Sequence, residues 1–79
     1  MVAGRKKVRR IDLRGKNFPL TIIILAKEAK SLSPKSSLLV ITDDLETVEQ
    51  AREWGERVSW ADVSSRKEKD YWVLRVMRT

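Results

Sequence analysis

Hydrophobic and polar positions along the chain follow two different spacings, which predict four strands and two helices. Residues 8–14 alternate loosely between apolar and charged side chains, as a half-buried strand does. Residues 37–42 contain a continuous apolar run, which is typical of a central strand buried on both faces or nearly so. The segments 58–64 and 71–77 also have strand patterns, and the charged segment 65–70 between them predicts a hairpin loop.

The first helix is predicted to follow a turn that ends at Asn17. Asn17 is a candidate N-cap, Pro19 suits the first helical turn, and Ser33-Pro34 predicts the end of the helix. The β-branched run at 21–24 would equally suit a strand. Read as a helix, the segment has an apolar face broad enough to lie on a sheet, formed by Leu20, Ile22, Ile23, Ile24, Leu25, Ala26, Ala29 and Leu32.

A second, amphipathic helix is predicted over residues 44–55. Asp43 is followed three residues later by Glu46, which is a capping-box pattern, and Gly55 is close to the position of a C-cap glycine. The apolar positions at helical spacing are Leu45, Val48, Ala51 and Trp54.

The predicted order of elements is β-α-β-α-β-β. This order favours an α+β fold, a two-layer sandwich in which two helices cover one face of a four-stranded mixed sheet. With 79 residues the chain is long enough for one domain, which we place at residues 8–79 after a flexible basic arm at residues 1–7.

The amino-acid composition removes several kinds of chemistry. The chain has no cysteine and no histidine, so it lacks a thiol nucleophile, thiolate or imidazole metal ligands, and an imidazole base. Adjacent Asp43 and Asp44 are a weak signal for a metal or an acid–base pair, and helix capping accounts for at least one of them. We therefore expect no enzymatic activity, no cofactor and no metal site.

Charge is distributed unevenly along the chain. Residues 1–16 hold seven basic side chains and one acidic one, whereas residues 43–56 hold six acidic side chains and one basic one. The basic end would suit an anionic partner, with phosphate contacts from Arg5, Lys6, Lys7, Arg9 and Arg10, although solubility explains the same pattern. No signal peptide or membrane-spanning run is visible, which favours a cytoplasmic location.

Three local patterns resemble the TusA-like (SirA-like) sulfur-carrier family. They are Asp12-Leu13-Arg14-Gly15 followed by Pro19, the strand Leu39-Val40-Ile41-Thr42 ending in Asp43-Asp44, and Trp54 late in the second helix. The family signature is Asp-x-x-Gly-x-x-Cys-Pro-x-Pro. In this chain Phe18 stands at the position of the reactive cysteine and Thr21 at the position of the second proline.

The resemblance implies a site at the start of the first helix. In the family, the helix field lowers the pKa of the cysteine there and the thiolate carries sulfur as a persulfide. This chain lacks that sulfur atom, so covalent carriage is excluded for it. The residues at the family's active-site position are Arg14, Lys16, Asn17, Phe18 and Pro19. Phe18 is either a docking residue or a contact on its own helix, and Arg14 with Lys16 either binds an anion or forms a solvated turn.

Two functions remain open. The first is a non-catalytic protein-interaction module or regulator related to sulfur transfer, monomeric or weakly dimeric. The alternative is RNA binding through the basic N-terminal arm and strand. Trp54, Trp60, Tyr71 and Trp72 would stack on bases if they lay on the open sheet face, but core positions are the more common place for such side chains.

Overall fold

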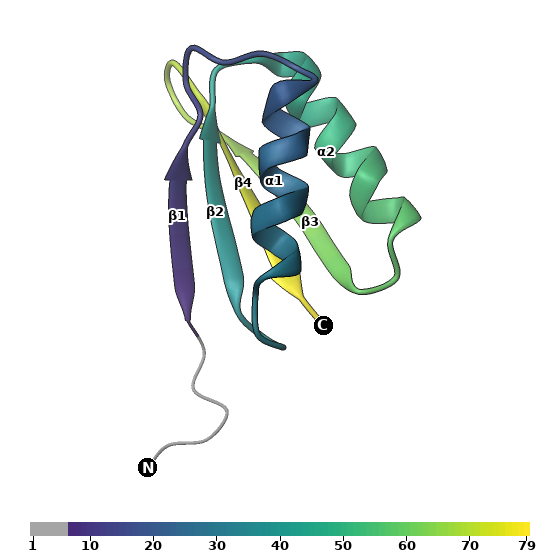
Figure 1. The fold of residues 1–79 in the computed structure, drawn as a ribbon. Coiled ribbons are helices and arrows are strands. Elements are labelled where there is room, and N and C mark those ends of the chain that lie inside the picture. The colour runs from purple at the N-terminus through teal and green to yellow at the C-terminus, as the bar shows by residue number, and fades with distance from the viewer. Residues whose placement is uncertain (1–6) are drawn as a thin grey trace.

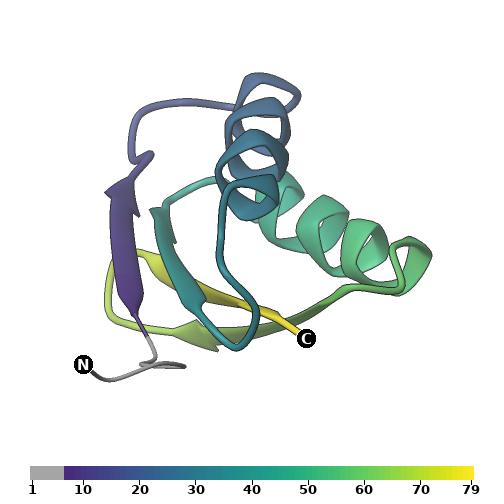
Figure 2. The same ribbon diagram turned by 60° about the horizontal axis from the view of Figure 1, so that its bottom comes forward.

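The four strands form one mixed sheet and both helices cover the same face of it. The computed structural model describes residues 7–79 (Figure 1). Its elements are β1 (Val8–Asp12), α1 (Leu20–Lys30), β2 (Ser37–Thr42), α2 (Leu45–Arg57), β3 (Ala61–Lys67) and β4 (Trp72–Arg78). The order of elements and the two layers confirm the fold class predicted from the sequence (Figure 2).

The strand order in the sheet is β1-β2-β4-β3. β1 is parallel to β2, with Ile11 opposite Val40, whereas β4 is antiparallel to both of its neighbours. The helices α1 and α2 are crossovers between strands that run in the same direction, β1 to β2 and β2 to β3, whereas the short connection Lys67–Trp72 joins the antiparallel neighbours β3 and β4.

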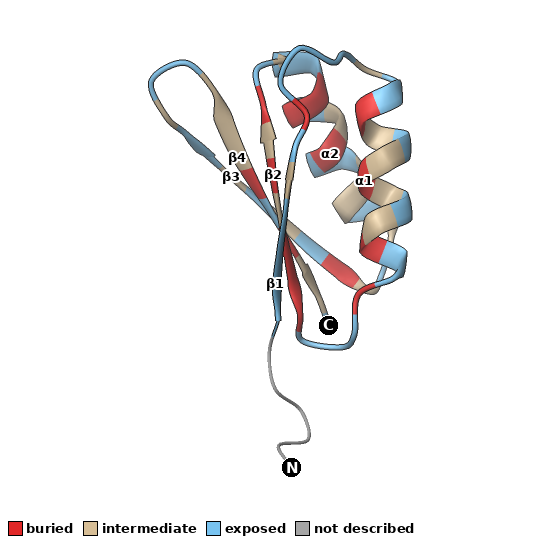
Figure 3. Cartoon of the chain, turned by 60° about the vertical axis from the view of Figure 1, so that its left-hand side comes forward, coloured by how far each residue is buried: buried red, intermediate tan, exposed pale blue. Residues whose placement is uncertain are grey.

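The core lies between the sheet and the helices. Leu38 and Val40 of β2 and Leu74 and Val76 of β4 are fully buried against a helical layer that includes Leu25. Burial follows the pleat, because successive side chains point to opposite faces of the sheet (Figure 3). The apolar run of β2 is therefore buried on the helix side, while Leu39 and Ile41 on the other side are half-buried.

The predicted boundaries of α1 are wrong at both ends. The helix begins at Leu20 after the N-cap residue Pro19, and no side chain caps it. Asn17 instead accepts a backbone hydrogen bond from the N–H of Thr21, at 3.3 Å, through its carbonyl oxygen. At the other end the last helical residue is Lys30, three residues before Ser33.

The apolar face of α1 is narrower than the sequence predicts. Leu25 and Ala29 are buried as expected, but Leu20 and Ile23 are 50% and 62% exposed. The buried position between them in sequence is Thr21. The reason is geometric, because a helix on a sheet buries one stripe, and this helix has more apolar residues than that stripe holds.

Gly55 lies inside α2 and is not its C-cap. The helix continues to Arg57, and Gly55 faces β3 where a Cβ atom would lie 2.6 Å from Cγ2 of Val63. The glycine therefore permits the close approach of helix and strand. β3 begins at Ala61, three residues later than predicted, because residues 58–60 complete the turn out of the helix and form no strand ladder.

The tryptophans belong to the helix-side layer. Trp54 and Trp60 meet edge to face, with ring centroids 5.5 Å apart, and Trp72 packs against the same core. This arrangement supports the structural interpretation of these three side chains. None of them is available on the open face of the sheet for base stacking.

Candidate functional site

The N-terminal ends of the two helices meet at the turn that contains Phe18. Both helices start at the same end of the molecule (Figure 1), and the hydroxyl oxygens of Thr21 and Thr47 lie 2.6 Å apart between them. Phe18 is half-buried and directly precedes Pro19, the N-cap of α1. The residue at the family's cysteine position is therefore at a helix start, as the sequence predicts.

Asp44 fixes the backbone of this turn. One of its carboxylate oxygens, Oδ2, accepts hydrogen bonds from the Phe18 N–H at 3.0 Å, the Thr47 N–H at 3.2 Å and the Thr47 hydroxyl at 2.6 Å. The hydrogen bond from the Thr47 hydroxyl and then that from Phe18 hold the pKa of Asp44 below its ordinary value, because both favour the charged carboxylate.

The donors in this network can be assigned from valence. The carboxylate of Asp44 only accepts, so the single hydroxyl proton of Thr47 is given to Asp44. The buried hydroxyl of Thr21 must then donate to Thr47. A continuous chain of hydrogen bonds thus runs from α1 through α2 to the turn before α1.

The helix cap is Asp44 and not Asp43, which corrects the predicted capping box. Asp43 instead accepts the backbone N–H of Gly15, at 3.1 Å to Oδ1 and 3.2 Å to Oδ2. Gly15 has a φ of 85°, a conformation that glycine adopts without a steric penalty. The two carboxylates therefore have different roles, because Asp44 fixes the backbone of the turn at Phe18 and Asp43 fixes it at Gly15.

Arg14 is engaged with a carboxylate of its own segment. Its guanidinium donates to both oxygens of Asp12, from Nη2 at 2.7 Å and from Nε at 3.1 and 3.2 Å, and lies 5.4 Å from the ring centroid of Tyr71. This pairing lowers the pKa of Asp12 and raises that of Arg14. The proposed anion site at Arg14 and Lys16 stays a prediction, and it gains no support because Asp43 and Asp44 already occupy the nearby amides.

The basic residues proposed as phosphate contacts do not share one surface. Arg9 points toward the helices and pairs with Glu28 at 2.8 Å, whereas Arg10 lies on the open face of the sheet. Lys7 is exposed just before β1, and Arg5 and Lys6 lie outside the described residues.

Sequence reasoning missed the exposed apolar side chains at the starts of the two helices. Leu20 and Leu45 are the first residues of α1 and α2, and they are 50% and 53% exposed. Ile23 lies one turn further along α1 on the side of Leu20 and is 62% exposed. We call Phe18, Leu20, Ile23 and Leu45 the end patch. The sequence signal for the end patch is the apolar character of these positions, which helical spacing alone assigns to the core.

Two structural features are absent from residues 7–79. Neither a group of three or more acidic side chains arranged to hold a metal ion nor a helix long and apolar enough to cross a membrane occurs in this part of the chain. The cytoplasmic location and the monomeric or weakly dimeric state stay predictions.

The fold and the site together define a small α/β domain of the sulfur-carrier class. Two helices cover one face of the β1-β2-β4-β3 sheet, and a proline follows the residue at the start of α1 where such carriers present their thiol. The family model described as sulfurtransferase TusA matches residues 9–78, and the chain belongs to this family. No curated protein matches the chain.

Proposed function

We propose that this protein is a non-catalytic member of the TusA family that binds another protein of a sulfur-transfer pathway through the end patch. The observation that carries the proposal is the composition of that end. Where a carrier would present a thiol, this chain has a half-buried phenylalanine, and Leu20 and Leu45, the first residues of the two helices that start at this end, are exposed.

The end patch has the properties of a binding surface and lacks those of a sulfur carrier. Exposed apolar side chains that gather at one place favour contact with a partner, because burying them removes apolar area from water. The hydrogen bonds of Asp43 and Asp44 hold the turn in one conformation, so little conformational entropy is lost on binding. With no cysteine in the chain, the contact is non-covalent.

The experiment compares what wild type and Phe18→Asp retain from a native lysate, using affinity capture with mass spectrometry. A carboxylate at residue 18 would be desolvated in the complex, so we expect proteins of sulfur transfer to be retained by wild type and lost from the variant. Ser33→Asp is the matched control, because it adds the same charge at an exposed site beyond the other end of α1.

Both variants should keep the far-UV circular dichroism of wild type. Retention of the same proteins by Phe18→Asp would reject the end patch as the docking surface. Loss of these proteins from Ser33→Asp as well would show that the added charge, and not its position, disrupts the contact.

A further inference from the structure

The open face of the sheet has an apolar centre although no element of the described chain covers it. Leu39 and Ile41 of β2 and Val73 of β4 point to this face and are half-buried. An antiparallel sheet with one solvated face normally places polar side chains there. The hydrophobic run of β2 is instead that of a strand with both faces covered.

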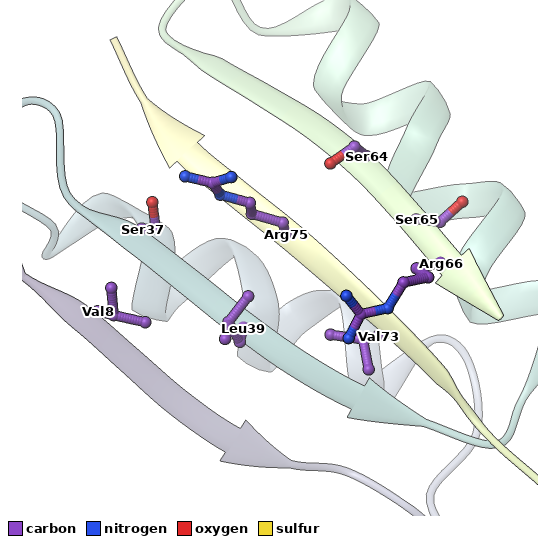
Figure 4. A pocket seen from close by; sticks show the side chains of 8 residues that line it. All are labelled: Val8, Ser37, Leu39, Ser64, Ser65, Arg66, Val73 and Arg75. Carbon is purple, nitrogen blue, oxygen red and sulfur yellow. The ribbon is translucent and has the colours of Figure 1, made fainter. Parts of the chain in front are cut away.

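Three arginines surround this apolar centre. Arg10 comes from β1, Arg75 from the middle of β4, where it is paired in register with Leu39, and Arg66 from β3, where it is paired with Val73. Figure 4 shows the side chains of Arg66 and Arg75 on the same face of the sheet as Leu39 and Val73, and these four residues help to line a shallow hollow. We call these three arginines with Leu39, Ile41 and Val73 the open-face surface.

The charge of the open-face surface is only partly balanced within residues 7–79. Arg66 pairs with Glu68 at 2.7 Å, but neither Arg10 nor Arg75 has a carboxylate of these residues within ion-pair distance. The acids that share this face are Asp12, which Arg14 already binds, and Asp62, which is opposite Met77. The face therefore presents positive charge next to apolar area.

We propose that the open-face surface binds an acidic amphipathic helix of a partner protein, with carboxylates on the arginines and aliphatic side chains on Leu39, Ile41 and Val73. A helix is the element that covers the other face of this sheet, and one more would complete a three-layer sandwich. Arginine is also one of the residue types that are enriched among those that contribute most at protein interfaces.

Two other occupants fit the surface less well. A second copy placed face to face by a twofold axis would bring like-charged arginines together. Single-stranded nucleic acid would need several ring platforms, but the three tryptophans lie on the helix side, and the Tyr71 ring, which lines this face beside Arg10 and Arg66, is already under the guanidinium of Arg14. The proposal is independent of the end patch, which belongs to the helical layer.

The test uses a fluorescein-labelled synthetic helix of sixteen residues, with a stripe of leucines bordered on both sides by glutamates, and measures its binding by fluorescence anisotropy. Two matched peptides replace either all leucines or all glutamates with glutamine. A labelled uridine dodecamer tests single-stranded nucleic acid as the alternative ligand. We expect the amphipathic acidic peptide to bind more tightly than both matched peptides and the dodecamer.

The variants locate the binding on the protein. Arg75→Gln should raise the Kd of the acidic peptide by about tenfold, the order expected when a charge-assisted contact is lost. Arg52→Gln removes the same charge from the exposed side of α2 and should leave the Kd unchanged. Val73→Thr keeps the shape and strand preference of the side chain but should weaken binding by making the apolar centre polar.

Several results would overturn the proposal. They are failure of the acidic peptide to bind, equal binding of the peptide without leucines, equal effects of Arg75→Gln and Arg52→Gln, or tighter binding of the dodecamer with the same dependence on Arg75. Phe18→Asp should not change peptide binding, so failure here is distinguishable from failure of the end patch as a docking surface.

Discussion

At the scale of single residues, Asp44 connects the candidate site to the stability of the fold. Its Oδ2 atom holds the first turn of α2 and the backbone of Phe18 at once. Because these hydrogen bonds lower its pKa in the folded protein, ionised Asp44 stabilises the fold above the unfolded-state pKa of about 4. That contribution is lost as the pH falls through the lower, folded-state pKa.

The variant Asp44→Asn tests this linkage, because the amide keeps an oxygen acceptor but carries no charge. We expect it to be less stable than wild type at pH 7 and to approach wild type as the pH falls below about 4. Asp44→Ala also loses the cap, so it should remain less stable at acid pH by about 1 kcal/mol. Urea unfolding over a pH series measures both differences, and a constant gap between wild type and Asp44→Asn would contradict the assignment.

The same residues show how far a local pattern can predict a site. The sequence placed Phe18 at a helix start correctly, because the surrounding motif is short and continuous. The capping-box pattern predicted Asp43 as the cap and was wrong, because both carboxylates are adjacent to the helix and Asp44 is the cap. The choice between them depends on Gly15, which is 28 residues away in sequence and contacts Asp43 only in the folded chain.

At the scale of elements, Gly55 sets the distance between α2 and β3. Alanine favours a helix interior by about 1 kcal/mol over glycine, so propensity alone predicts that Gly55→Ala stabilises the protein. The new Cβ would lie 2.6 Å from Val63 Cγ2 and 2.9 Å from Val63 Cβ. We expect this crowding to cost about 1–3 kcal/mol and to make the variant less stable than wild type by chemical denaturation.

Val63→Ala provides the control, because it removes the nearer of the two crowded atoms. The cost of Gly55→Ala should shrink in that background, and a double-mutant cycle measures the coupling. An unchanged cost would place the origin of the effect elsewhere in the helix.

All six elements could be predicted from periodicity, but their exact ends could not. Periodicity also could not show which of their apolar residues are exposed. α1 and α2 each have more apolar residues than their buried stripes hold, so sequence periodicity could not separate core positions from Leu20, Ile23 and Leu45. The apolar residues of β2 are ambiguous in the same way, because the sequence of a single strand does not show which of its two faces a helix will cover. In all three elements the surplus apolar residues became candidate binding surfaces.

At the scale of the whole molecule, the two ends of the helical layer are closed in different ways. Asp44 and the two threonines join the helix starts. At the other end, Arg78 of the last strand donates from Nη1 to the carbonyl oxygens of Lys30 and Leu32, at 2.8 and 3.1 Å. Its guanidinium also lies 5.0 Å from the ring centroid of Trp60. Arg78 thus joins the C-terminal strand to α1 and to the segment after α2.

Arg78→Gln should therefore lower the free energy of unfolding by about 1–3 kcal/mol, because hydrogen bonds from a charged donor and a cation–π contact are lost together. Arg78→Lys should recover part of that loss, since an ammonium group cannot reproduce the planar fork. Arg75→Gln, three residues earlier on the opposite face of β4, should change the stability by less than about 0.5 kcal/mol. If both glutamine variants were equally unstable, general loss of charge would explain the effect. If only Arg78→Gln is less stable than wild type, Arg78 joins the strand to the helical layer. Arg75 can then contribute to binding without affecting the stability of the fold.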